Sequence, residues 1–159
     1  MALTTLYATT GDDVVLLRET TRGWTVEPLL RGVGAQCLAI DPGDGHHLAV
    51  GTFDEGVFLS EDGGRSWRRA ERLPATRVLS GAISPAWRVA GHGVLFAGCE
   101  PSALYWSEDG GRHWHEASAL RQLPSAPTWS FPPRPWTSHV RAIALSPRDP
   151  GLVLVGIEL

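Results

Sequence analysis

The octapeptide "SEDGGRSW" occupies residues 60–67, and nearly the same octapeptide, "SEDGGRHW", occupies residues 107–114. Seven of the eight letters recur 47 positions later in the chain. A catalytic motif seldom needs two copies, whereas a structural turn often does. The recurrence therefore predicts a repeat architecture in which each octapeptide closes one unit.

Other patterns recur with the octapeptide. Apolar stretches that end at a proline, a residue without the N–H that a strand needs, occupy residues 36–42, 79–85 and 141–147. The apolar stretch that follows each of them carries a glycine at the same place, at Gly51, Gly98 and Gly156. A further strand leads into the octapeptide, and another strand begins after it. The repeat unit is therefore read as four antiparallel strands, A, B, C and D.

Four-stranded repeats of about 40–50 residues are typical of a β-propeller, so the expected fold is all-β, with four-stranded antiparallel blades. Residues 1–159 are predicted to form a single partial domain. Its units are B–C–D over about 1–34, A–B–C–D over 35–75, A–B–C–D over 76–120, a Pro/Trp-rich insertion over 121–137, and A–B over 138–159. These are about three blades of an incomplete ring, since propellers close with roughly four to eight blades. We therefore expect either association of identical chains or further blades beyond Leu159.

The residue types of the octapeptide suit a tight hairpin. Serine and aspartate side chains can accept hydrogen bonds from turn amides, glycine can adopt a positive φ, and tryptophan can pack against the neighbouring blade. A structural role is thus predicted for ten residues, which are Ser60, Asp62, Gly63, Gly64, Trp67, Ser107, Asp109, Gly110, Gly111 and Trp114.

The octapeptides resemble the Asp-box, S-x-D-x-G-x-T-W, of the BNR-repeat family, with Ser66 and His113 in place of threonine. That family includes sialidases, sortilin-type receptors, xyloglucanase-like glycosidases and photosystem-assembly propellers. The segment over residues 128–144 is similar to a stretch found in bacterial proteins described as WD40/YVTN/BNR-like or sialidase-like. The resemblance implies a bacterial BNR-type propeller, but it implies no particular activity, because the box occurs in enzymes and non-enzymes alike.

Strand order divides the loops between two faces. The A–B and C–D turns share one face, here named the A–B face, and the B–C and D–A connections share the other, the B–C face. Acidic residues follow the B-strand glycine in successive units, at Asp54 or Glu55, at Glu100 and at Glu158. Function is expected on the B–C face, with Asp54, Glu100 and Glu158 as candidate catalytic carboxylates or as plain solvated groups.

The insertion and the first residues of the A strands supply candidate ligand contacts on the B–C face. Exposed aromatic rings with arginine can stack on sugar rings or peptide groups, although the same tryptophans could instead fold back as a plug. The candidate ligand-binding residues are Trp129, Phe131, Arg134, Trp136, His139, Arg141 and Arg77. His139 is expected to lie within one residue of facing Glu158, and Arg77 similarly of Glu100, so cross-strand ion pairs are the favoured interpretation.

The leading functional hypothesis is a binding or assembly scaffold that holds a protein, peptide or glycan on the B–C face. The alternative is a glycoside hydrolase of sialidase or xyloglucanase type, which requires two carboxylates at a defined separation or, in sialidases, a tyrosine nucleophile. Whether the protein is an enzyme stays open. The sialidase F/Y-R-I-P motif is absent from the sequence, and Tyr7 and Tyr105 lie within predicted strands.

Composition limits the other function classes. The net charge of −3 and the absence of basic runs predict no nucleic-acid partner. The N-terminal sequence lacks the features of a signal peptide, and no apolar stretch is long enough to cross a bilayer, so a cytoplasmic protein without a membrane partner is expected. Cys37 and Cys99 are predicted to be reduced core thiols. No metal site and no cofactor are expected, and His46 and His47 are assigned a surface role in an A–B turn.

Overall fold

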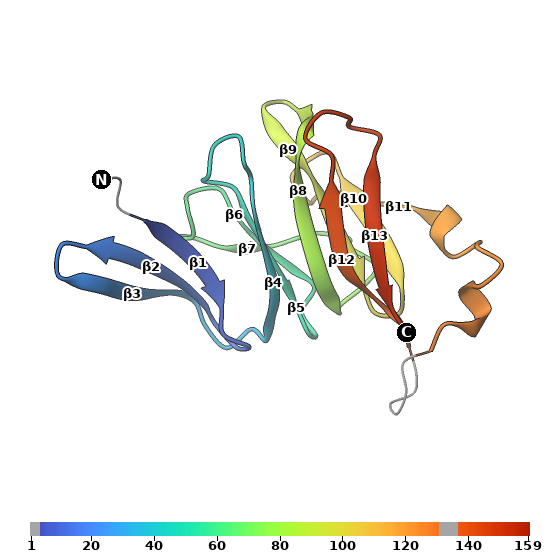
Figure 1. Cartoon of the computed structure of the whole chain (residues 1–159), viewed down its shortest axis with the longest axis horizontal. Coiled ribbons are helices and arrows are strands. Elements are labelled where there is room, and N and C mark those ends of the chain that lie inside the picture. The colour runs from blue at the N-terminus through green and yellow to red at the C-terminus, as the bar shows by residue number, and fades with distance from the viewer. Residues whose placement is uncertain (1–3, 131–136) are drawn as a thin grey trace.

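The computed structural model describes residues 4–130 and 137–159, and its regular structure is almost entirely β-strand (Figure 1). The strands form four antiparallel sheets, numbered I to IV in chain order. Sheet I contains β1 (Thr5–Thr9), β2 (Val14–Thr20) and β3 (Gly23–Leu30). Sheet II contains β4 (Ala35–Ile40), β5 (Leu48–Thr52), β6 (Val57–Ser60) and β7 (Arg68–Arg69). Sheet III contains β8 (Val78–Val89), β9 (His92–Cys99), β10 (Ala103–Ser107) and β11 (His115–Glu116), and sheet IV contains β12 (His139–Leu145) and β13 (Val153–Glu158).

Each sheet is a meander in which consecutive strands pair. Sheets II and III have four strands each, in the orders β4-β5-β6-β7 and β8-β9-β10-β11. The first strands of neighbouring sheets pack together, β4 against β8 and β8 against β12, and β1 packs against β4. Figure 1 shows the four sheets side by side in chain order. This is the arrangement of successive propeller blades, and the predicted fold class is confirmed.

The apolar core lies between neighbouring sheets. Val14 of sheet I packs with Ala35 and Val50 of sheet II. Sheet II meets sheet III through a larger cluster that contains Leu59 and Tyr105. Residues Gly93–Cys99 of β9 are all buried, because β9 is a central strand of a sheet covered on both faces.

Both octapeptides form the same hydrogen-bonded turn. The amide of Gly64 donates to Ser60 Oγ over 2.8 Å, and the Ser60 hydroxyl donates to Asp62 Oδ1 over 2.8 Å. Ser107, Asp109 and Gly111 repeat these contacts. The glycines have positive φ, for example 75° at Gly63, as the sequence analysis predicted.

Ser66 and His113, at the penultimate position of the two octapeptides, make equivalent hydrogen-bonding contacts. Ser66 Oγ lies 2.6 Å from Asp62 Oδ2, and His113 Nδ1 lies 2.6 Å from Asp109 Oδ2. Each side chain therefore bonds the carboxylate that organises its turn. Both octapeptides therefore keep a side-chain contact between the penultimate residue and the turn carboxylate.

The expectation that proline ends strand A is wrong for Pro85. Strand β8 continues beyond this proline to Val89, with an irregular register between Ile83 and Arg88. Proline is tolerated here because an irregularity in the ladder removes the need for its missing N–H. The extra residues carry Arg88 toward sheet II, and they end in a two-residue turn with φ of 48° at Ala90 and 89° at Gly91.

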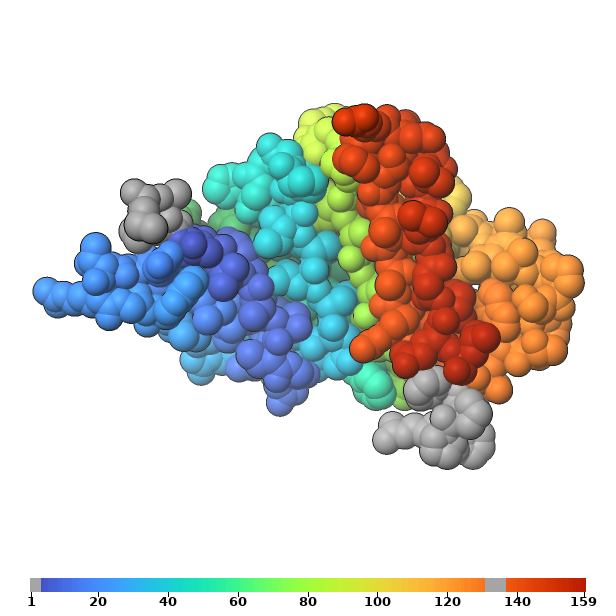
Figure 2. Space-filling view, in the orientation of Figure 1, coloured from blue at the N-terminus to red at the C-terminus, as the bar shows by residue number. Residues whose placement is uncertain are grey.

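Two short 3-10 turns lie near the start of the insertion. The first, η1 (Ser118–Leu120), directly precedes it, and the second, η2 (Ala126–Thr128), lies within it. This segment protrudes beside sheet IV in the space-filling view (Figure 2). Among residues 4–130 and 137–159, no helix has the length and apolar character needed to cross a membrane.

Candidate ligand-binding face

The B–C face, at the lower edge of Figure 1, carries the residues that the sequence analysis selected. Arg77, directly before β8, lies between two of the candidate carboxylates. Its Nε is 3.5 Å from Asp54 Oδ1, and its Nη1 is 3.6 Å from Glu100 Oε1. The guanidinium also lies 4.5 Å from the centre of the Phe53 ring, which is within the range of a cation–π contact. Arg77 thus joins the B–C loops of sheets II and III.

Sheet IV carries a second ion-paired group on this face. His139 faces Glu158 in the β12–β13 register, as predicted. His139 Nε2 lies 2.8 Å from Glu158 Oε2, and Arg141 Nε lies 3.5 Å from the same oxygen. His139 is buried, so its ring is held in one place. The structure therefore brings Arg77 together with Asp54 and Glu100, and His139 and Arg141 together with Glu158.

The residues immediately before β12 connect the two groups. Thr137 Oγ1 donates to Glu100 Oε1 over 2.5 Å, and the buried hydroxyls of Ser138 and Ser102 lie 2.8 Å apart. A cavity of about 320 Å³ opens beside this contact. Its lining consists of Pro101, Ser102, Arg121, Ala126, Pro127, Trp129, Thr137 and Ser138. Trp129, which is half-buried, is the aromatic residue of this lining.

Phe131, Arg134 and Trp136, the other candidates of the insertion, lie outside the residues that the structure describes. Trp129 and Thr137, on either side of this segment in the chain, both line the 320 Å³ cavity.

Each candidate carboxylate has a cationic partner. Asp54 and Glu100 share Arg77, and Glu158 lies between His139 and Arg141. The structure holds these groups as salt bridges, which fits the favoured interpretation of the sequence analysis.

Other nucleophile types are poorly placed. Tyr105 is buried in the core, and Tyr7 donates its hydroxyl to Gly63 O over 3.3 Å. Both cysteines are unpaired thiols. Burial raises the pKa of Cys37 to about 11 and that of Cys99 to about 12. Neither thiol therefore supplies a reactive thiolate near neutral pH.

A larger cavity of about 410 Å³ opens on the opposite, A–B face, between sheets II and III. Its lining includes both octapeptide turns, together with Asp41, His47 and His92. The sequence analysis sought function only on the B–C face and did not select these residues. One signal was available: Asp41 precedes a proline at the position where the later repeats have Ser84 and Ser146.

Asp41 is fully buried and is held by four hydrogen bonds. Arg88 donates to both of its oxygens, at 2.8 and 3.0 Å, and the amides of Gly43 and Gly93 donate at 2.7 and 3.0 Å. Burial would raise the pKa of this carboxyl, but the hydrogen bonds and the charge of Arg88 outweigh it and lower the pKa to about 2. Asp41 is therefore a charged anchor at the wall of the larger cavity.

No protein-family model matches the sequence, and no curated protein matches it. Among solved structures, the chain is similar to a GH74 xyloglucanase from Xanthomonas campestris, with 22% sequence identity and a TM-score of 0.49. The similar region covers 72% of this chain and 21% of the xyloglucanase chain, so the protein described here spans about a fifth of that enzyme's length.

Proposed function

We propose that the chain is a BNR-type propeller segment that acts as a binding scaffold and holds a ligand on its B–C face. The observation that carries this proposal is the 320 Å³ cavity beside Trp129. An aromatic ring, two prolines and three hydroxyl-bearing side chains line it, and the nearby carboxylates are already paired with cations. Concave sites with an apolar wall and a few polar groups are typical of ligand binding.

A neutral glycan fits this lining best. The flat face of a sugar ring can stack on Trp129, and its hydroxyls can exchange hydrogen bonds with Ser102, Thr137 and Ser138. Arg121 is the one charged residue among the described lining, and it forms an ion pair with Glu116. A strongly charged ligand would therefore find no unpaired countercharge in the described part of the cavity.

Affinity electrophoresis through gels that contain soluble neutral polysaccharides tests the proposal. We expect retardation by at least one polysaccharide and loss of the retardation in Trp129→Ala. Trp24→Ala is the matched control, because Trp24 is an exposed tryptophan on β3, in sheet I. Equal retardation of both variants would contradict the assignment to Trp129, and binding of peptides but not of polysaccharides would overturn the glycan class.

Glycoside hydrolysis is the alternative function. Its general acid and its second carboxylate would be two of the three residues Asp54, Glu100 and Glu158. Each of these carboxylates has a salt-bridge partner in the structure. Release of nitrophenol from aryl glycosides, abolished by Glu100→Gln or Glu158→Gln, would support the enzyme. Binding without turnover, unaffected by these two changes, supports the scaffold.

A further inference from the structure

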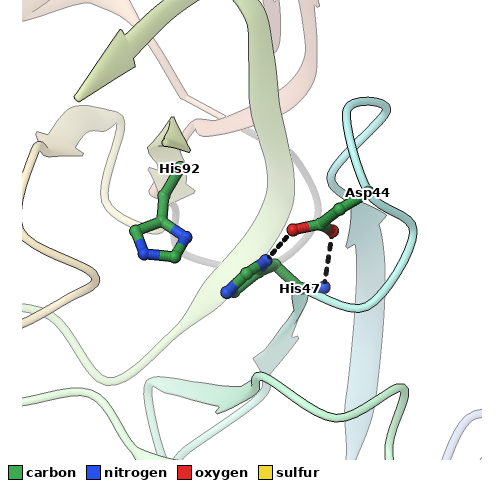
Figure 3. Close-up of side chains that lie close together, drawn as sticks. All are labelled: Asp44, His47 and His92. Atoms are coloured by element: carbon green, nitrogen blue, oxygen red, sulfur yellow. Dashed lines mark hydrogen bonds and ion pairs between the residues drawn. The ribbon is translucent and has the colours of Figure 1, made fainter. Parts of the chain in front are cut away.

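Three side chains with metal-binding atoms meet on the A–B face, away from the proposed glycan site (Figure 3). Asp44 and His47 belong to the turn between β4 and β5, and His92 begins β9. One potential ligand atom from each residue lies within 4.8 Å of the other two. The rings of His47 and His92 approach edge to face, with centroids 4.3 Å apart. Residues from two successive sheets therefore converge on one point.

The turn between β4 and β5 holds Asp44 and His47 in place. Asp44 Oδ1 accepts hydrogen bonds from the amides of His46 and His47, at 2.8 and 3.2 Å. Its other oxygen, Oδ2, contacts Nδ1 of His47. The carboxylate and the imidazole are thus oriented before any ligand arrives, which lowers the cost of ordering them on binding.

The neighbouring hairpin places His92 opposite them. His92 pairs with Val89 across the tight turn at the end of β8. The adjoining pair is Arg88 and Gly93, and both of these residues bond Asp41 of the β4–β5 connection. The same contacts that join sheets II and III therefore fix the position of the His92 backbone relative to Asp44 and His47.

We propose that Asp44, His47 and His92 bind one divalent first-row transition-metal ion, with Zn²⁺ as the expected ion. Two imidazoles and one carboxylate form a nitrogen and oxygen ligand set that suits Zn²⁺, whereas Ca²⁺ and Mg²⁺ prefer oxygen ligands alone. Ligand atoms around tetrahedral zinc lie roughly 3.4 Å apart, given bonds of about 2.1 Å. The potential ligand atoms lie within 4.8 Å of one another, so the widest separation would need to contract by at most about 1.4 Å. His92 is exposed and able to turn toward the other two residues.

The larger cavity gives the metal site an open side. His47 and His92 both line the 410 Å³ cavity between sheets II and III, together with Arg68 and Arg112. Three protein ligands leave one position of a tetrahedral ion for water or another small ligand. The site thus has the ligand number of an open zinc centre, in contrast to a closed structural one.

Calorimetric titration of the tag-free chain with Zn²⁺, in a buffer that does not chelate metals, tests the proposal. We expect one equivalent of Zn²⁺ to bind and one equivalent of Co²⁺ to show the intense visible bands of four-coordination. His47→Ala and His92→Ala should each weaken binding at least about tenfold. His46→Ala is the matched control, because His46 lies in the same turn but outside the cluster, and it should bind like the unaltered chain.

Two results would overturn the proposal: no binding of Zn²⁺ or Co²⁺ to the folded chain, or equal affinity in His92→Ala and the unaltered chain. Asp44→Asn is a second test, because asparagine retains an oxygen for the His46 and His47 amides but lacks the charge, and it should also weaken binding. Far-UV circular dichroism checks that each variant is folded. The glycan site lies on the other face, so failure of the metal site leaves the proposed function untouched.

Discussion

Asp41 and Arg88, 47 positions apart in the sequence, form a two-bonded ion pair that joins sheet II to sheet III. Arg88 Nη1 lies 2.8 Å from Asp41 Oδ1, and Arg88 Nη2 lies 3.0 Å from Asp41 Oδ2. The carboxylate is fully buried, whereas the guanidinium reaches the surface and also donates to Gly91 O. The pair therefore fixes the β8–β9 hairpin on the β4–β5 connection.

Removal of the guanidinium should destabilise the fold strongly. Arg88→Met leaves the buried Asp41 charge with only two amide donors, and breaking a buried pair in this way costs about 3–5 kcal/mol. Urea unfolding followed by tryptophan fluorescence measures the change. Arg148→Met, at an exposed position of the β12–β13 turn, should alter stability by less than about 0.5 kcal/mol. Equal stability of the two variants would refute the anchoring role.

Acid should weaken the same contact. The pKa of Asp41 is about 2 in the folded chain and about 3.9 in an unfolded one, so the folded state favours the charged form. Charged Asp41 therefore adds about 2.5 kcal/mol to the free energy of unfolding above about pH 4, and this stabilisation is lost as the pH falls toward 2. Thermal unfolding between pH 5 and pH 2.5 should therefore show a shallower loss in Asp41→Asn than in the unaltered chain. Parallel curves would contradict this linkage.

Exposed apolar residues predict self-association. Val26 on β3 is 62% exposed and Leu154 on β13 is 63% exposed, and β13 pairs only with β12 among the described residues. Unpaired strand edges and exposed apolar side chains promote association. The double variant Val26→Thr and Leu154→Thr should give a lower mean mass in light scattering at equal concentration. Thr25→Ser is the control, and an unchanged mass in the double variant would refute the prediction.

The repeat pattern predicted the sheets well, because the regular features of the chain are local. Alternating apolar residues, the glycine of strand B and the octapeptide turn all act within one unit, so a sequence pattern is enough to place them. The cross-strand partners His139 and Glu158 follow from the same regularity.

The contacts between units were harder to predict. Arg88 reaches Asp41 only because β8 continues past Pro85, and His92 reaches His47 only because the two hairpins lie side by side. Such contacts depend on the distance between neighbouring sheets, which no short-range pattern encodes. The sequence around His47 therefore did not predict its contact with His92 of the next repeat, and the sequence analysis assigned His47 a surface role.

Gly98 should be much less replaceable than Gly156, the strand-B glycine of sheet IV. A Cβ at this position would lie 2.2 Å from Ser80 Oγ of β8 and 2.5 Å from Val140 Cγ1 of β12, so these two strands leave no space for it. Gly98→Ala should cost about 1–3 kcal/mol, the usual cost of overpacking. Gly156→Ala is the matched control, because its Cβ would meet Ala142 at an ordinary 3.5 Å.

Chemical unfolding of both variants measures this difference. Gly156→Ala should change the free energy of unfolding by less than about 0.5 kcal/mol, as is usual where a new side chain makes no clash. Equal stability of Gly98→Ala and Gly156→Ala would mean that sheets III and IV separate enough to admit a methyl group. In that case Val140 would not pack against β9 as closely as the structure places it.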